Sequence, residues 1–227
     1  MKKYLIIFSI LLIVIAIINN KKIIEYSLVK NLSKITDHKV TLNLNKIDYF
    51  SGNIEIINIK IKNKDNFFND NIFEAKKLKI NLNIHTIMSD LVVVENLFIS
   101  EPKFYFEIKA VKKTDKEEEL NDNINLLSNI NAKEKPKTYP EKNKDKNFVI
   151  SILNLKDSIT YIKSPKNNNN INVTLSDMKF VNVGNSAKKD VKKFQHYKDI
   201  MKIILTDTYL RITDPDLKNL IKINYDL

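Results

Sequence analysis

The sequence is short of the residues on which many catalytic and ligand-binding motifs depend. It has no cysteine and only two glycines, Gly52 and Gly184, among 227 residues. Without cysteine the chain has no disulfide, no thiolate nucleophile and no zinc–thiolate site. With two isolated glycines it can build neither a phosphate-cradling P-loop nor a dinucleotide-binding fingerprint. These absences exclude thiol chemistry and glycine-loop nucleotide binding.

Arginine is also nearly absent, although the chain is strongly basic. The formal net charge is +11, yet Arg211 is the one arginine among 38 basic residues. Recognition of base edges relies on bidentate arginine, and phosphate clamps often do. The lysines are spread evenly among Asn and Ile, as a biased genomic base composition would produce. We therefore expect no nucleic-acid partner, whereas lysines beside a membrane would be attracted to anionic headgroups.

Residues that could carry acid–base or metal chemistry are scattered. His38, His85 and His196 fall at a helix end, at a strand end and within a helix, without the close spacing of a metal site. The acidic run at residues 115–119 is typical of a solvated linker. The sequence therefore predicts no catalytic residues, no metal and no cofactor, and we expect a non-enzymatic protein.

The chain does have one long apolar run, at its start. Residues 4–18 carry no charge and are bracketed by paired lysines at 2–3 and 21–22. As a helix this run is roughly 22 Å long, short for a hydrocarbon core of about 30 Å. Lysine side chains extend such a span by snorkelling to the headgroups. The run predicts a transmembrane anchor over residues 1–21.

Two other interpretations of this run stay open, a cleaved secretory signal and a buried core helix. A signal has the same basic start and apolar stretch, but the small-x-small cleavage site is missing, because Ala16 is the one small residue near the end of the run. The flanking lysines nearly balance, so they orient the anchor weakly. We expect the N-terminus inside and the body exported, giving a single-pass inner-membrane protein with its body in the periplasm.

Residues 22–110 are predicted to form a helix and a first β-meander. An apolar stripe at helical spacing follows the anchor, made of Ile24, Leu28, Leu32 and Ile35, and predicts an amphipathic helix. From residue 39 the period changes to two, which predicts strands. A hairpin turn is expected at residues 51–53 and a β-bulge where the alternation slips, at residues 56–57.

The second half is divided by a change of composition. Residues 111–147 are rich in Lys, Glu, Asp and Asn and are predicted to be a charged flexible linker. Residues 148–214 alternate again and end in a helix that is expected to start at Ala187. No structure is predicted for the tail, residues 215–227. The fold class expected is α+β, mainly β: an antiparallel, curved, groove-like meander sheet with a C-terminal helix.

The alternation places aliphatic side chains on one face of this sheet. A curved sheet left open on that side would shelter acyl chains, so these residues are the candidate lipid-facing set. The alternative is that they fill an ordinary core against the helices. The set comprises Leu42, Leu44, Ile59, Ile61, Leu78, Ile80, Leu82 and Ile84.

The predicted anchor and amphipathic helix are followed by five segments with a recurring pattern of aliphatic residues. These are Lys39–Leu42, Ile47–Ile54, Ile57–Ile61, Phe73–Leu82 and Val93–Phe104. The order of these segments resembles the N-terminal module of the AsmA-like envelope proteins. The resemblance covers most of the chain and lies in patterns of aliphatics with one Gly and one Pro.

The resemblance implies an inner-membrane-anchored protein of a Gram-negative-type bacterium with a periplasmic β-groove similar to those of bridge-like lipid transporters. It implies a role in outer-membrane lipid homeostasis or assembly, with membrane lipids as partners. Eight strands side by side at about 4.8 Å would span only about 38 Å, so the chain would not bridge an envelope alone. The alternative function is a structural protein of a secretion or assembly complex that docks a partner through a sheet edge.

Overall fold

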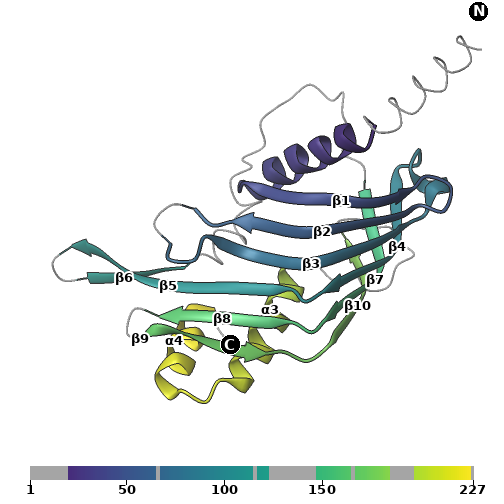
Figure 1. Cartoon of the computed structure of the whole chain (residues 1–227). Coiled ribbons are helices and arrows are strands. Elements are labelled where there is room, and N and C mark those ends of the chain that lie inside the picture. Colours follow the sequence, from purple (N-terminus) through teal and green to yellow (C-terminus); the bar gives the residue numbers. More distant parts are fainter. Residues whose placement is uncertain are drawn as a thin grey trace, which may run out of the picture.

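The computed structural model describes residues 20–64, 67–114, 117–122, 147–164, 167–184 and 197–225. A helix over residues 20–36 precedes the sheet, and a short 3-10 helix, η1 (Ile84–Thr86), lies within it (Figure 1). The strands and the C-terminal helices are β1 (Val40–Asp48), β2 (Asn53–Lys62), β3 (Asn71–Leu82), β4 (Leu91–Ser100), β5 (Lys103–Thr114), β6 (Glu117–Asp122), β7 (Asn147–Lys156), β8 (Ile159–Ser164), β9 (Asn167–Thr174), β10 (Met178–Gly184), α3 (Tyr197–Arg211) and α4 (Pro215–Tyr225).

The predicted class, α+β and mainly β, is confirmed, but the sheet is mixed and not an antiparallel meander. Strand β4 runs parallel to β7, and β5 runs parallel to β8. A parallel pair needs a long crossover connection, and the charged segment between β6 and β7 supplies the length. Sequence alternation reports which face a side chain occupies, not the direction of the neighbouring strand, so the expectation of antiparallel pairing was wrong.

Several strands lie end to end, so the sheet is narrower than the strand list suggests. Lys77 faces Ser100 on β4 and Phe73 faces Phe104 on β5, so β4 and β5 follow one line beside β3. In the same way β8 continues β7, and β10 continues β9. Apart from β6, which pairs with the end of β5, the described strands therefore form six rows. At about 4.8 Å each, these rows span roughly 25–30 Å and not the width expected from eight strands side by side.

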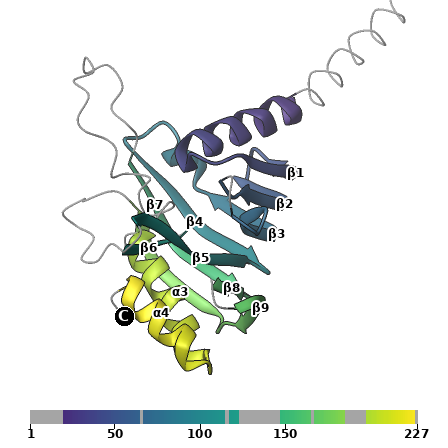
Figure 2. The same ribbon diagram turned by 90° about the vertical axis from the view of Figure 1, so that its left-hand side faces the viewer.

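The interruptions in these rows share one level of the sheet, and we call this line the crease. It is defined by Asn58, Glu101 and Asp157, whose φ angles are 55°, 51° and 56°. Lys76 lies between the first two on β3, and its amine is 2.6 Å from the Glu101 carboxylate. Backbone pairing continues across the crease, because Glu101 N–H donates to the Lys156 carbonyl at 2.9 Å. Figures 1 and 2 show the sheet bending along its strands.

The crease keeps one face of the sheet apolar along its whole length. The buried side chains of β7 are at odd positions, such as Leu153 and Leu155, whereas those of β8 are at even positions, Thr160 and Ile162. A left-handed residue between the strands shifts the alternation by one, as β-bulges do. The predicted bulge at residues 56–57 is close to a register shift that the structure places opposite Thr41 and Asn43, with Asn58 left-handed.

Helices cover this apolar face at two places (Figure 2). Helix 20–36 packs Ile24, Leu28 and Leu32 against a core of β1, β2 and β3. Helices α3 and α4 contribute Ile204, Leu217 and other aliphatics to a second core with β5, β7, β8, β9 and β10. The amphipathic helix predicted after the anchor is thus present and lies on the sheet.

The structure differs from the predictions for the charged linker and for the C-terminal tail, and it leaves other predictions untested. Residues 111–114 and 117–122 lie in β5 and β6, so the charged linker is not irregular there; cross-strand pairing of lysines with glutamates is compatible with a strand. The tail contains α4, whose N-terminus is capped by the Asp214 carboxylate, which accepts from Leu217 N–H at 3.1 Å, with Pro215 in the first turn. Residues 1–19, 123–146 and 185–196, including most of the anchor and the expected start at Ala187, lie outside the described residues.

Asp157 offers a test of the crease. At φ 56° a β-branched residue is strained, whereas glycine adopts this conformation readily. Asp157→Val should therefore lower the free energy of unfolding by about 1–2 kcal/mol, and Asp157→Gly should not lower it. Lys156→Val, one position earlier in β7, is the matched control. Chemical denaturation of the full chain in mild detergent measures the difference. Equal effects of the two valine variants would contradict a strained crease.

Candidate functional site

The candidate lipid-facing residues divide into three groups. Leu42, Leu44 and Ile59 are buried beneath helix 20–36 and belong to the core. Ile61, Leu78 and Ile80 are only half-buried and border that core. Leu82 and Ile84 are half-buried at the end of β3 and in η1, outside both cores. The core interpretation therefore applies to the first group. Of the second group, Leu78 and Ile80 on β3 stay candidates for the open face, whereas Ile61 lies on β2.

Helix 20–36 also closes the outer edge of β1. The Leu44 N–H donates to the Glu25 carboxylate at 2.8 Å, and the Val40 N–H donates to the Ser33 hydroxyl at 3.0 Å. Lys21 donates to the Asn45 carbonyl at 2.9 Å. These side chains take the place of a further strand, so the edge at β1 is protected.

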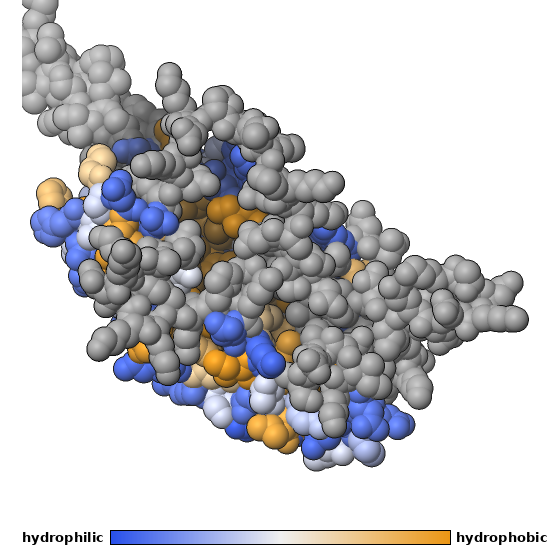
Figure 3. Space-filling view, turned by 180° about the vertical axis from the view of Figure 1, so that it is seen from behind, coloured by the Kyte–Doolittle hydropathy of each residue, from blue (hydrophilic) through white to orange (hydrophobic). Residues whose placement is uncertain are grey.

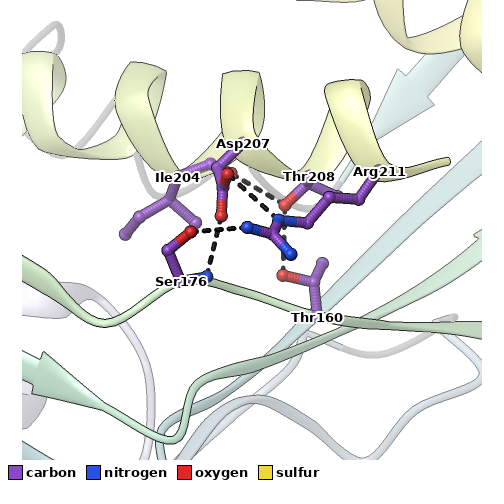
Figure 4. Close-up of polar contacts among 6 residues, drawn as sticks. All are labelled: Thr160, Ser176, Ile204, Asp207, Thr208 and Arg211. Atoms are coloured by element: carbon purple, nitrogen blue, oxygen red, sulfur yellow. Dashed lines mark hydrogen bonds and ion pairs between the residues drawn. The ribbon is translucent and has the colours of Figure 1, made fainter.

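The second helical cover is fixed by polar contacts from α3 (Figure 4). Arg211 donates to Asp207 at 3.1 Å and also to the Ser176 hydroxyl, while Ser176 N–H donates to Asp207 at 3.0 Å. Deeper in the interface, the fully buried hydroxyls of Thr160 and Thr208 are 3.2 Å apart. The helix is therefore tied to the loop at the crease by the chain's one arginine.

A strip of the apolar face lies between the two covers, and we call it the central strip. It consists of half-buried side chains on β3 and β4, and two of them, Phe73 and Ile99, border both cores. Figure 3 shows apolar side chains at the floor of a hollow on this face. The strip is about two strand spacings wide, roughly 10 Å. Its members are Phe73, Leu78, Ile80, Leu97 and Ile99.

Sequence reasoning found Leu78 and Ile80 but missed the other three members of the strip. The missed signal is the change from odd to even apolar positions between Ile99 and Phe104, on either side of Glu101 and Pro102. With the crease placed there, the apolar positions of β4 and β5 join the same face as those of β3.

A polar hollow lies elsewhere on the crease, with a volume of about 210 Å³. Three of its charged groups have partners: Lys76 pairs with Glu101, and the Glu74 carboxylate accepts from Asn71 at 2.6 Å; Lys60 and Lys103 complete the charged lining. Beside it, burial and the Glu74 charge raise the pKa of Tyr105 to about 12. These polar contacts lie on the face of the sheet opposite the apolar face.

The two histidines in the described residues, His38 and His85, lie apart. His38 is buried between helix 20–36 and β1, where its Nδ1 donates to the Lys62 carbonyl at 2.8 Å and its Nε2 has no partner among the described residues. Burial lowers the pKa of His38 below 6.5. His85 is exposed in η1, and His196 lies outside the described residues. In the part of the chain that is described, no three His, Asp or Glu side chains are grouped to hold a metal.

The fold and the central strip define a mainly β protein with one apolar sheet face that helices cover in part. No protein-family model, curated protein or solved structure matches the chain. Within the described residues, no helix is both long and apolar enough to cross a bilayer.

The threonine pair should couple α3 to the sheet. Thr208 donates to the Ile204 carbonyl at 2.7 Å, so its oxygen is the acceptor for Thr160. Thr208→Val leaves the Thr160 hydroxyl without its partner in the interior and should cost about 1–3 kcal/mol. The double variant Thr160→Val/Thr208→Val should lose less than the sum of the single variants in denaturant titrations. Thr206→Val is the control, because it removes the same type of hydrogen bond, from a threonine hydroxyl to the carbonyl four residues earlier, on the exposed side of the helix.

His38 should make stability depend on pH. Because its pKa is lower in the folded chain than in the unfolded chain, the unfolded state binds more protons at mildly acidic pH. The stability that His38 contributes through its lowered pKa is therefore fully present above about pH 6.5, and it falls as the pH drops below that value. In urea titrations at pH 7.5 and 5.5, His38→Gln should reduce this loss, and His85→Gln should not. An unchanged loss in His38→Gln would contradict the assignment.

Proposed function

We propose that this chain is a non-enzymatic, membrane-anchored protein that binds lipid acyl chains on the central strip. The observation that carries the proposal is a row of half-buried apolar side chains between two helical covers that do not meet over them. An acyl chain lying along the strip would remove this surface from water, at about 25 cal/mol for each Å² buried.

The arrangement favours a ligand that is long, apolar and thin. The floor is built from aliphatic and phenyl side chains, whereas the hollow on the crease is small and lined mainly by charged and polar residues. Apolar sites of this kind discriminate by shape and bury most of a ligand's surface. A headgroup would remain outside the strip, where lysines are plentiful.

The sequence supports a place at a membrane. Residues 4–18 are an uncharged apolar run that ends directly before helix 20–36, and helix 20–36 is bound to β1. We propose an anchor in the inner membrane with the body in the periplasm, and a role in lipid homeostasis or outer-membrane assembly as a short AsmA-like protein. A sheet of six rows cannot cross the envelope, so lipid movement over that distance would need a partner.

The alternative function, docking through a sheet edge, would use one particular edge. Helix 20–36 protects the β1 edge, whereas β9 and β10 have no further strand beside them among the described residues. Val181 on β10 is 49% exposed. A protein partner would therefore add to the β9–β10 edge, either to extend the apolar face or as a purely structural contact.

Photocrosslinking from the strip tests lipid binding. A photoreactive amino acid at Ile80 or Leu97 of the full chain in cells should form adducts with lipid, detected by mass spectrometry of the purified protein. Lys79 is the matched control, because it is exposed on the same strand and points to the opposite face. Adducts from positions 80 and 97 but not 79 are expected.

Other products from the same positions would overturn the proposal. Crosslinks from 80 and 97 to other segments of the chain would show that the strip is closed by the protein itself. A stoichiometric protein adduct without lipid would favour docking as the function.

A further inference from the structure

The two most exposed of the large apolar side chains in the described residues lie at one end of the sheet, each with an exposed apolar neighbour in the chain. Phe50 is 91% exposed and Met88 is 92% exposed, and their neighbours Tyr49 and Ile87 are 56% and 38% exposed. Phe50 and Tyr49 lie in the turn between β1 and β2, and Ile87 and Met88 follow η1. We call these four residues the apolar tip. They take no part in either core.

The two segments of the apolar tip lie against each other. The Leu82 N–H donates to the Gly52 carbonyl at 2.9 Å. A Cβ on Gly52 would be 2.0 Å from the Leu82 carbonyl oxygen and 3.0 Å from Ile84 Cγ2, so the contact leaves no room for a larger residue. Gly52 also has φ +69°, which glycine adopts without strain.

Each segment is held in a fixed conformation that presents its apolar side chains to solvent. The Asp48 carboxylate accepts from Phe50 N–H at 3.0 Å and from Ser51 N–H at 3.2 Å. In the other segment, Thr86 donates to the Asn83 carbonyl at 2.7 Å and accepts from Val93 N–H at 2.9 Å. Hydrogen bonds thus fix the conformation of both segments of the tip.

The apolar tip lies at the end of the sheet where the chain enters the fold. Lys21, at the start of helix 20–36, bonds to Asn45 near the end of β1, and β1 leads directly into the turn. Figure 1 shows the turn, η1 and the start of this helix on the same side of the molecule. The sequence directly before this helix is the uncharged apolar run of residues 4–18.

We propose that the apolar tip is a membrane-contact site that inserts into the interface of a phospholipid bilayer. The proposal rests on the membrane anchoring proposed above and adds the orientation of the domain: the tip faces the bilayer that holds the anchor. Aromatic and flexible apolar side chains are favoured at the boundary between headgroups and acyl chains.

Charged side chains of both signs surround the tip. Lys21, Lys22 and Lys46 are exposed near it, and Asp48, Asp90 and Glu95 are acidic groups beside it. Hydrogen bonds from the Ser51 side chain and from the backbone of the turn hold the pKa of the Asp48 carboxyl below the usual value, so Asp48 stays ionised and opposes the lysines as Asp90 does. Lysines near an anionic leaflet attract it within about a Debye length.

The absence of tryptophan from the chain gives a clean experiment. Phe50→Trp and Met88→Trp each place a single tryptophan at the tip of the full chain, reconstituted in vesicles of phosphatidylcholine and phosphatidylglycerol. The control is Phe68→Trp, because Phe68 is also exposed, at 66%, but lies in the connection between β2 and β3, at the opposite end of those strands.

Brominated lipids should quench the tip tryptophans and leave the control bright, whereas aqueous iodide should quench the control several-fold more strongly. Iodide quenching of both tip variants as strong as that of the control overturns the membrane contact. Shielding from both quenchers also overturns it, because the tip would then be buried against protein.

Flotation of the vesicles on a density gradient separates this failure from that of the proposed function. If the chain floats and the tip stays accessible to iodide, the inference is wrong and the anchor stands. If the chain does not float, both the anchor and the tip contact are overturned. Crosslinking of lipid from position 80 reports on the central strip independently of either result.

Discussion

One-sided burial is the constraint on which the rest of the structure depends. The sheet has a continuous apolar face, and that face has to be shielded from water along strands that change their alternation at the crease. Left-handed residues at Asn58, Glu101 and Asp157 keep the apolar side chains on the same side. Helix 20–36 and the pair α3 and α4 then remove the two ends of this face from water. The central strip is what remains, and so the proposed site is defined by where the helices stop.

Local patterns predicted much of the fold. The alternation at Val40, Leu42 and Leu44 identified a strand with one buried face, and the stripe at Ile24 and Leu28 identified the helix that covers it, because both depend on side chains a few residues apart. The end-to-end strands and the parallel pairs could not be predicted in this way. They depend on which distant segments pair, and the chain carries the same alternation whichever neighbour it has.

The candidate site was predicted in part for the same reason. Leu78 and Ile80 were identified by alternation within one strand, whereas Leu97 and Ile99 join them through the register of β3 with β4. Leu42, Leu44 and Ile59 have an identical pattern but lie under a helix, since periodicity identifies a face without showing what covers it. Helix α4 was missed although Asp214 and Pro215 carry the residue types of a helix start.

The way helix 20–36 is bound to β1 has a consequence for aggregation. Glu25 and Ser33 occupy backbone donors that an additional strand would otherwise take. If the helix were pulled away, β1 would become a bare edge next to a newly wetted aliphatic surface, which is the template from which intermolecular β-stacking grows. A pulling force on the segment before helix 20–36 would thus act on the contact between this helix and β1, and the integrity of the sheet requires that the helix stay docked.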